Sequence, residues 1–446
     1  MRSTLRASSA SRFRSLRLGA VVPTAGLALL VALGCSSTSD GDVPVGGNAG
    51  AGAASGAGAS GMSTGGSGGV NAGGSGGCSP GEGCGGSVAG SGGAGPGSGG
   101  TMPSGQGGRN EAGAGIAGGT SNEPRVHYVG RVDTSVGGEA RFAWSGTGAV
   151  VRFEGTAASV ELEGGQEYTV VVDGAVQSKL QAVDGVNPLA SGLGVGSHTI
   201  ELYRRTEAAE GESTILGFDF GAGGKLLAPP PVTRRLEFIG DSITCGYGNE
   251  GASAACDFTP QTENHYLSYA AITARDLQAE LSTVAWSGKG VVCNYGDDAS
   301  SCTDPLPSYY DRILPSRADS VWDFARFQPD AVVINLGTND LSTSTDPAES
   351  TFEDAYKALL KRVRNAYPSA HILCTNGPML GGADLANARR YIQDAVTDLG
   401  DPNISVFELA TQDGSDGFGC NSHPSLERHR KMATVVTAAI RSALDW

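Results

Sequence analysis

A long glycine-rich segment limits which parts of this chain can form a packed fold. Of the 70 glycines in the 446 residues, 34 lie between Ser36 and Thr120, mixed with alanine and serine. Such a composition buries too little apolar surface to offset the conformational entropy of the backbone. We therefore expect residues 36–122 to be a disordered linker that acts as a tether, and the folded domains to lie in residues 123–446.

The first 35 residues have the layout of a secretory signal. Five arginines precede Leu18, and an apolar run that Pro23 interrupts continues to Leu33. This run is too short for a confident membrane span, and a basic segment followed by a short apolar one is typical of export signals. Residues 1–35 are therefore expected to send the protein out of the cytoplasm.

The end of this segment resembles a bacterial lipobox, in which the cysteine becomes lipidated and is the first mature residue. The sequence Val-Ala-Leu-Gly-Cys ends at Cys35, although Ala32 stands where leucine is usual. Lipidation of Cys35 would anchor an extracytoplasmic protein to a membrane or cell surface. The alternative is an ordinary cleaved signal and free secretion. We expect a monomer in either case.

The charge of the chain restricts its partners. The formal net charge is −15, and the five arginines before Leu18 leave −20 on the remainder. An acidic surface does not attract nucleic acid or anionic lipid. It suits a neutral or weakly charged polysaccharide, so we expect no nucleic-acid partner.

Residues 123–229 read as an all-β module. Short runs of alternating apolar and polar residues recur between turn residues, without helical periodicity, which is typical of a sandwich. The predicted strands are Arg141–Trp144, Ala149–Phe153, Ser159–Leu162, Tyr168–Gly174 and His198–Tyr203. Such a module can bind sugar or serve as a structural partner of a catalytic domain, and we favour the structural role.

Residues 232–446 alternate strand and helix, which predicts an α/β domain with a parallel sheet and helices on both faces. The predicted strands are Leu236–Ile239, Leu281–Trp286, Ala331–Leu336, Ala370–Cys374 and Ile404–Glu408. Helical spacing of apolar residues appears around Tyr356, Ala395 and Val436.

Chemically useful residues follow three of these strands. Ser242 comes after the first strand, in a Gly-Asp-Ser triplet that by itself favours the cap of a helix over a nucleophile. Gly288 follows the second strand and Asn339 the third, so all three are expected at one rim, where parallel sheets bind ligands. His423 precedes a proline, which favours an extended loop over a helix.

Together these four blocks resemble the SGNH (GDSL-type) hydrolases, which have a flavodoxin-like sheet. The resemblance implies that Ser242 is the nucleophile and His423 the base. It also implies that the Ser242 and Gly288 N–H groups and the Asn339 amide form the oxyanion hole. The longer strings GDSITCGYGNEG, SGKGV and YYDRIL are similar to carbohydrate esterase family two, whose members remove acetyl groups from plant polysaccharides and carry a jelly-roll module before the hydrolase.

The third member of a catalytic triad is missing from its usual place. Many SGNH hydrolases carry an aspartate two or three residues before the histidine, where this chain has Cys420 and Asn421. Asparagine cannot stabilise an imidazolium as a carboxylate does. The resemblance implies a way out, since some relatives use a Ser-His dyad with a backbone carbonyl orienting the histidine. We predict such a dyad, with Asp416 or Asp413 folding back as the second choice.

The cysteine count favours an oxidising compartment. Apart from Cys35 there are eight cysteines, an even number, and none of them are spaced as a zinc-binding pair. Sequence proximity suggests the pairs Cys78–Cys84, Cys245–Cys256 and Cys293–Cys302, which leaves Cys374–Cys420. Many other pairings are possible. We expect no metal site and no cofactor.

The leading hypothesis is a serine esterase that removes O-acetyl groups from plant-type polysaccharides such as xylan and glucomannan. The reaction would pass through an acetyl-enzyme on Ser242, with His423 as base. One rival is an SGNH lipase or thioesterase that acts on other acyl esters. Another is an inactive carbohydrate-binding surface lipoprotein.

Overall fold

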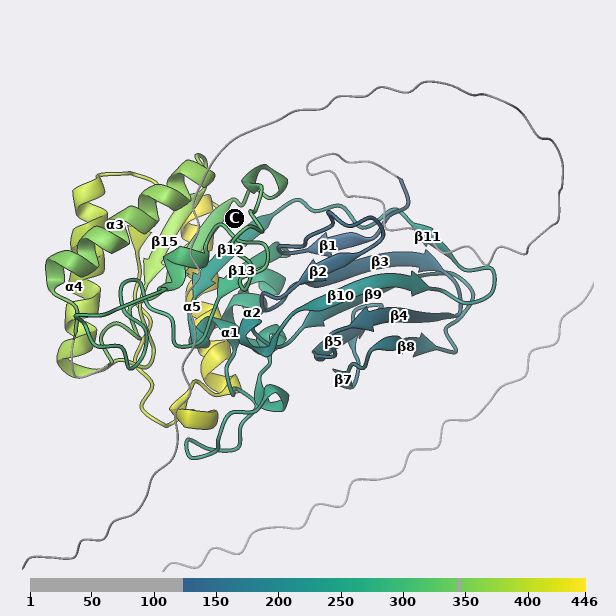
Figure 1. Ribbon diagram of the computed structural model, residues 1–446, viewed down its shortest axis with the longest axis horizontal. Helices are drawn as coiled ribbons and strands as arrows, with labels where there is room; N and C mark the ends of the chain where they lie inside the picture. The colour runs from purple at the N-terminus through teal and green to yellow at the C-terminus, as the bar shows by residue number, and fades with distance from the viewer. Residues whose placement is uncertain (1–122, 343–345) are drawn as a thin grey trace, which may run out of the picture. The chain divides into compact units, whose positions relative to one another are not determined.

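The computed structural model describes residues 123–342 and 346–446 (Figure 1). The predictions for the export signal, the linker, Cys35 and the Cys78–Cys84 pair lie outside these residues. Among the described helices, none combines the length and the hydropathy needed to cross a bilayer.

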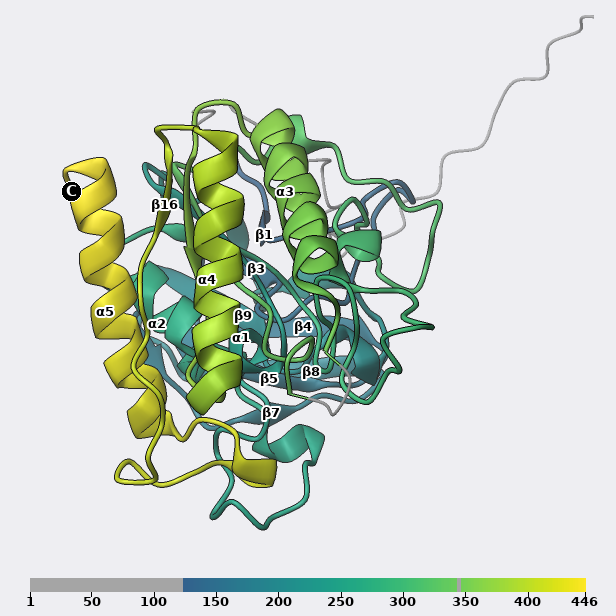
Figure 2. The same ribbon diagram turned by 90° about the vertical axis from the view of Figure 1, so that its left-hand side faces the viewer.

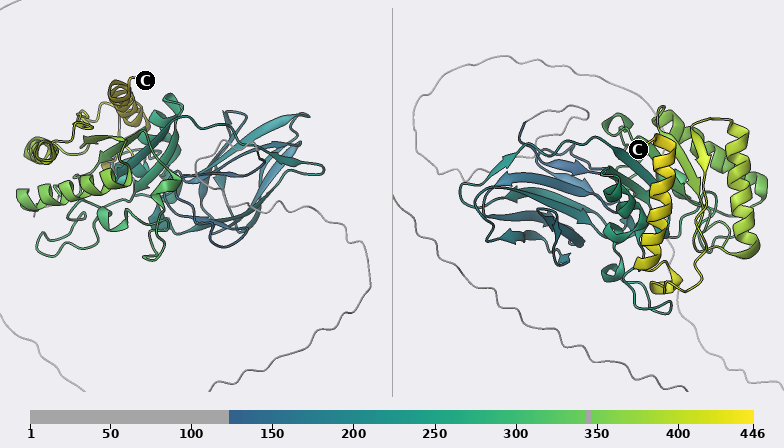
Figure 3. Two further views of the ribbon diagram at one scale, coloured as in Figure 1. Left: turned by 90° about the horizontal axis from the view of Figure 1, so that it is seen from above. Right: turned by 180° about the vertical axis from the view of Figure 1, so that it is seen from behind.

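Residues 127–227 form the predicted sandwich of two antiparallel sheets, which face each other in Figure 3. The first sheet contains β1 (His127–Val129), β3 (Gly148–Glu154), β5 (Glu167–Val172), β6 (Ala175–Val176), β7 (Leu180–Gln181), β9 (Ser197–Arg204) and β11 (Lys225–Leu227). The second contains β2 (Ala140–Phe142), β4 (Ala157–Glu163), β8 (Gly185–Ser191) and β10 (Ser213–Asp219). Their orders are β1-β3-β9-β5-β6, with β11 beside β3 and β7 beside β5, and β2-β10-β4-β8.

Alternating burial explains why this segment folds as two facing sheets. Val151 and Phe153 of β3 are fully buried, whereas the Arg152 side chain between them is exposed. Val160 and Leu162 of β4 repeat the pattern from the opposite sheet. Successive side chains of a strand point to opposite faces, so each strand gives every second residue to the shared core.

All five strands predicted in this segment are present, with ends shifted by a few residues. Six further strands were not predicted: β1, β6, β7 and β11, of two or three residues each, and the seven-residue β8 and β10. Each of the two longer strands contains a residue that weakens a strand pattern, Pro188 in β8 and Gly217 in β10.

The C-terminal segment contains one sheet of five parallel strands, which confirms the predicted α/β class. Its strands are β12 (Arg235–Gly240), β13 (Glu280–Ala285), β14 (Ala331–Asn335), β15 (His371–Thr375) and β16 (Ile404–Val406). They stand in the order β13-β12-β14-β15-β16. This is the flavodoxin-like order 2-1-3-4-5, in which the strand order reverses between β12 and β14, the place where such sheets bind ligands.

Helices cover both faces of this sheet (Figure 2). One face packs against α2 (Tyr269–Asp276) and α5 (Leu426–Leu444), through buried side chains such as Phe238 and Met432. The other packs against α3 (Glu349–Ala366) and α4 (Gly382–Leu399). Helix α2 was not predicted, because it is short and largely made of alanine and polar residues.

Two buried side chains of the sandwich enter the hydrolase half. The guanidinium of Arg131 donates to Glu237 at 3.2 Å and to the backbone oxygen of Tyr310, and both charged side chains are fully buried. Trp144 is also fully buried, and its ring nitrogen donates to the backbone oxygen of Arg312 at 3.1 Å. A buried charge needs a partner and hydrogen bonds, so these contacts join the two halves into one packed unit.

Candidate active site

Ser242 is the first residue of the short helix α1 (Ser242–Cys245), directly beyond the end of β12. The carboxylate of Asp241 accepts a hydrogen bond from the N–H of Ile243 at 3.0 Å and so caps this helix. A Cβ at Gly240 would lie only 2.0 Å from Thr244 Oγ1, so this position requires glycine. The local backbone thus presents the serine hydroxyl at the rim of the sheet.

His423 lies on the loop before α5, with its side chain aimed at this serine. Its Nε2 is 2.8 Å from Ser242 Oγ, and its Nδ1 is 3.2 Å from the backbone oxygen of Asn421. A proton on Nδ1 satisfies the carbonyl and leaves Nε2 free to accept the serine proton. Burial lowers the pKa of His423 to about 4, although the Asn421 and Cys420 backbone contacts act in the opposite direction.

No carboxylate of the described residues is hydrogen-bonded to His423. Asp413 is exposed, and its carboxylate accepts from the N–H and hydroxyl of Ser415. The carboxylate of Asp416 pairs with Arg428 at 3.5 Å and with Lys431. The backbone oxygen of Asn421 occupies the place that the acid of a triad would take.

Two backbone N–H groups at the rim are unused. Within residues 123–342 and 346–446, the N–H groups of Ser242 and Gly288 have no hydrogen-bond acceptor. Gly288 has a φ of +76°, and a Cβ there would meet nothing within 4 Å. This glycine therefore has open space beside it and a backbone conformation that other residues rarely adopt.

The third proposed donor, the Asn339 amide, is held by its neighbours. Its Nδ2 donates to the backbone oxygen of Lys289 at 2.9 Å and makes a longer 3.4 Å contact with Asp241. The amide is thus fixed in the same small region as the serine.

Burial raises the pKa of Asp241 to about 7, and the nearby Asp340 carboxylate contributes in the same direction.

Asp340 fixes the loop that follows Gly288, as a turn-fixing acceptor. Its carboxylate accepts from the N–H groups of Val291, Val292 and Cys293 at 2.7 to 2.9 Å. The predicted Cys293–Cys302 disulfide closes the next part of this loop.

Two of the predicted disulfides are wrong. Cys420 pairs with Cys256 instead of Cys374, across 164 residues, while Cys245 and Cys374 are free and buried. Cys245 lies in α1 and Cys374 in a central strand, so both side chains belong to the interior. Pairing by sequence proximity failed because a disulfide depends on the distance between Cα atoms in the fold.

Sequence reasoning missed the aromatic residues beside His423. The Tyr247 ring lies 4.3 Å from the imidazole and is stacked on Phe258 at 4.1 Å, measured between ring centroids. The Asn421 side chain accepts from the N–H of Phe258 at 3.1 Å and from the Tyr247 hydroxyl at 3.2 Å. Tyr247 stands in the string that carries the Gly-Asp-Ser triplet, but nothing in the sequence connects Phe258 to it.

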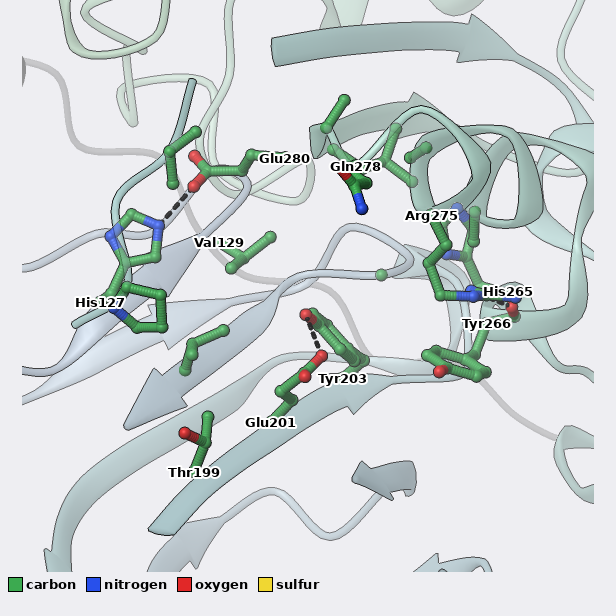
Figure 4. A pocket seen from close by; sticks show the side chains of 18 of the residues that line it. His127, Val129, Thr199, Glu201, Tyr203, His265, Tyr266, Arg275, Gln278 and Glu280 are labelled. Carbon is green, nitrogen blue, oxygen red and sulfur yellow. Dashed lines mark hydrogen bonds and ion pairs between the residues drawn. The ribbon is translucent and has the colours of Figure 1, made fainter. Parts of the chain in front are cut away.

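A cavity of about 260 Å³ lies elsewhere, between the first sandwich sheet and α2 (Figure 4). Its polar lining includes Glu201, which accepts from the Tyr203 hydroxyl, and Glu280, which pairs with His127. None of the four candidate residues lines it. The cavity is therefore separate from the site at the strand ends.

Two groups of described side chains bring possible metal ligands within 4.8 Å of one another. One is the exposed to half-buried set Glu349, Glu353 and Asp394, and the other is the buried set Glu207, Cys245 and Glu263. In the buried set, Glu207 accepts from the N–H of Ser287 and Glu263 accepts from the N–H of Glu207. These carboxylates already serve as hydrogen-bond acceptors.

Known proteins resemble this chain over both halves. Residues 128–230 match the family "Carbohydrate esterase 2 N-terminal", and residues 238–431 match the "GDSL-like Lipase/Acylhydrolase family". Cellulase/esterase CelE of Acetivibrio thermocellus is 46% identical over 336 residues, which are 73% of this chain and 40% of that protein. The chain therefore aligns with less than half of CelE.

Two further relatives are matched over nearly their whole length. "Acetylxylan esterase / glucomannan deacetylase" of Cellvibrio japonicus is 26% identical, over 73% of this chain and 91% of that protein. The structure of a family two carbohydrate esterase from Clostridium thermocellum, in complex with cellohexaose, is 45% identical, with a TM-score of 0.68. It matches 72% of this chain and 99% of that one. At this identity and coverage, the chain belongs to carbohydrate esterase family two.

Proposed function

We propose that this protein is a serine esterase that removes O-acetyl groups from plant-type polysaccharides such as xylan and glucomannan. The observation that carries the proposal is the 2.8 Å contact between His423 Nε2 and Ser242 Oγ, next to two unused N–H groups. The substrate class is supported by the relative named as an acetylxylan esterase and glucomannan deacetylase. The cellohexaose bound to the Clostridium enzyme supports a β-linked glycan partner.

In this mechanism Ser242 Oγ attacks the acetyl carbonyl carbon while His423 Nε2 takes the hydroxyl proton. The carbonyl oxygen becomes an oxyanion, which accepts hydrogen bonds from the unused N–H groups of Ser242 and Gly288. The Asn339 amide joins them by giving up its longer 3.4 Å contact with Asp241 and keeping its bond to Lys289. The C–O bond to the sugar then breaks, and the proton on Nε2 passes to the leaving sugar oxygen. Water, deprotonated by the same nitrogen, hydrolyses the acetyl-enzyme and releases acetate.

The backbone carbonyl beside the imidazole has a passive role. The backbone oxygen of Asn421 accepts from Nδ1–H and keeps the ring in the tautomer that has a free Nε2. Each oxyanion donor is worth about 2.7–4 kcal/mol of the barrier in the enzymes where one has been removed.

We further propose that Cys35 is lipidated and that residues 36–122 tether the catalytic half to a membrane or cell surface. The apolar run before Cys35 supports this assignment. Cells expressing the Cys35→Ala variant should release the enzyme or retain its signal, whereas the parent chain should incorporate a fatty-acid label. Absence of label in the parent chain would contradict the anchor.

The esterase proposal is tested by measuring acetate release from acetylated xylan and acetylated glucomannan. We expect the Ser242→Ala and His423→Ala variants of the full chain to lose at least about 10⁴-fold in kcat, because the two groups act as a unit. Nitrophenyl acetate should be preferred to long-chain nitrophenyl esters. Glycan binding without turnover by the parent chain, or full activity of Ser242→Ala, would refute the proposal.

A further inference from the structure

We propose that Glu207, on the loop after β9 of the sandwich, is a positioning residue for the oxyanion hole, because it fixes the backbone that carries the Gly288 N–H. This inference rests on the proposed function. It gives the sandwich a part in the reaction that needs no contact with the glycan: the sandwich sets the geometry of one donor in the other half of the molecule.

The contact that carries the proposal is a single hydrogen bond across the two halves. Glu207 is 2% exposed, and its carboxylate accepts the N–H of Ser287 at 2.6 Å. Ser287 directly precedes Gly288, whose own carbonyl accepts the N–H of Tyr295 at 2.8 Å. Glu207 therefore fixes the Trp286–Ser287 peptide unit, and the Tyr295 N–H fixes the Gly288–Lys289 unit. The unit that carries the Gly288 N–H lies between these two fixed units.

Glu207 can serve as a fixed point because its own backbone is held. Its N–H donates to the buried carboxylate of Glu263 at 3.0 Å, and its carbonyl accepts from the guanidinium of Arg204 at 2.8 Å. Arg204 is fully buried and also binds the backbone oxygen of Thr206 at 3.0 Å. The neighbouring Arg205 donates to the backbone oxygen of Glu263 at 3.2 Å. The segment thus connects the sandwich rigidly to the catalytic rim.

The consequence for catalysis follows from the position of Gly288. An oxyanion donor works only when its N–H is aimed at the place where the charge develops. Without the Glu207 acceptor, the Ser287 N–H would need another partner, and the Trp286–Ser287 peptide unit would rotate to find one. That rotation would shift the adjoining unit, which carries the Gly288 N–H. A displacement of about 1 Å in a catalytic group can lower a rate by about 10²-fold.

Two substitutions separate the reach of the side chain from its charge. Glu207→Asp keeps the carboxylate but shortens the side chain by one methylene, so the oxygen no longer reaches the Ser287 N–H. Glu207→Gln keeps the length and an acceptor oxygen but removes the charge. A positioning role predicts that Glu207→Asp is damaging and Glu207→Gln is mild, whereas a need for the charge predicts the reverse order.

The matched control is Glu167→Ala, which removes another buried carboxylate of the sandwich. Glu167 is 3% exposed, and its side chain contacts Gln261 at 3.4 Å and has no contact with the Gly288 loop. We expect it to lower the melting temperature while leaving kcat unchanged. It therefore separates general destabilisation of the sandwich from a specific effect on the oxyanion hole.

All variants of the full chain are assayed for acetate release at a temperature well below their melting temperatures. We expect Glu207→Asp to lower kcat by about 10- to 100-fold with KM within about twofold, and Glu207→Gln to stay within about fivefold of the parent. An unchanged kcat in Glu207→Asp, or an equal loss in Glu207→Gln, would overturn the positioning role.

Ser242→Ala is measured in the same assay to keep the two claims apart. If Ser242→Ala remains active, the proposed esterase mechanism fails, whatever the Glu207 variants do. If Ser242→Ala is inactive and Glu207→Asp is as active as the parent, the esterase proposal stands and only the role of Glu207 is overturned.

Discussion

Ser242 stands two residues beyond a central strand, whereas His423 lies on an irregular loop 181 residues later in the chain. The serine inherits its place from the sheet, because β12 lies between β13 and β14 and the chain turns directly into α1. The histidine directly follows the three-residue 3-10 turn Cys420–Ser422 and lies outside any strand or α-helix. It depends on contacts with another loop.

These contacts are both covalent and polar. Cys420 is bonded to Cys256, and the N–H groups of Cys420, Asn421 and Ser422 donate to the backbone oxygens of Gly248, Cys256 and Ala254. Asn421 and Ser422 have left-handed backbones, with φ of +49° and +60°. Such conformations are uncommon in residues other than glycine and persist where surrounding contacts determine them. The proposed nucleophile is thus placed by regular structure, whereas the proposed base is placed by a disulfide and hydrogen bonds between two loops.

The largest loss of activity is expected on the serine side, where the turn after β12 has no room for a larger residue. Gly240→Ala would put a Cβ 2.0 Å from the hydroxyl of Thr244, which is fully buried and bonded to Tyr269 at 2.8 Å. We expect the variant to lose at least about 1–3 kcal/mol of stability and most of its activity, measured by thermal melting and acetate release. Adding Thr244→Gly, which removes both Oγ1 and the Thr244 Cβ that would lie 2.6 Å away, should restore part of both. Parent-like melting of Gly240→Ala would contradict this view of the turn.

An intermediate effect is expected when the cross-link of the histidine loop is removed. The double variant Cys256→Ser and Cys420→Ser should lose about 2–4 kcal/mol of stability. Its kcat should fall by about tenfold or more even far below the melting temperature, because a misplaced base loses its alignment with the hydroxyl. Near-UV circular dichroism and melting curves check the fold. A parent-like kcat would mean that the hydrogen bonds alone position His423.

A smaller effect is expected in the pH profile of kcat/KM. The base must be neutral, and burial lowers the pKa of His423 from an ordinary 6.5 to about 4. Activity should therefore persist as the pH falls below 6.5 and be lost only near pH 4. Asp241, whose pKa is raised to about 7, should add a second inflection, and Asp241→Asn should remove that one alone. A single acid limb near pH 6.5 in both proteins would contradict the expected shift for His423.

The smallest effect is expected from the aspartates that could complete a triad. Asp413→Ala and Asp416→Asn should each leave kcat within about twofold, because their carboxylates contact Ser415 or the pair Arg428 and Lys431. Asp416→Asn should lower the melting temperature slightly. A severe loss of turnover in either folded variant would replace the dyad by a triad.

Residues near strand ends could be predicted from the sequence, and loop-to-loop contacts could not. Buried strands leave a clear apolar signal, so the rim that carries Ser242, Gly288 and Asn339 followed from the pattern. The partner of Cys420 depends on how two loops meet, which leaves no local trace. The same holds for Glu207, an ordinary glutamate in sequence whose role depends on the distant Ser287 N–H.

The buried pair of Arg131 and Glu237 determines where this protein can be divided or joined to other proteins in gene fusions. Glu237 lies in the central strand of the hydrolase, and its cation comes from the sandwich. Cutting at the three prolines after Ala228 would leave this buried carboxylate without its cation, and only hydroxyl groups would still donate to it, which is strongly destabilising. Gene fusions that respect this chemistry would transfer both halves as one cassette, joined to foreign modules outside residues 123–446.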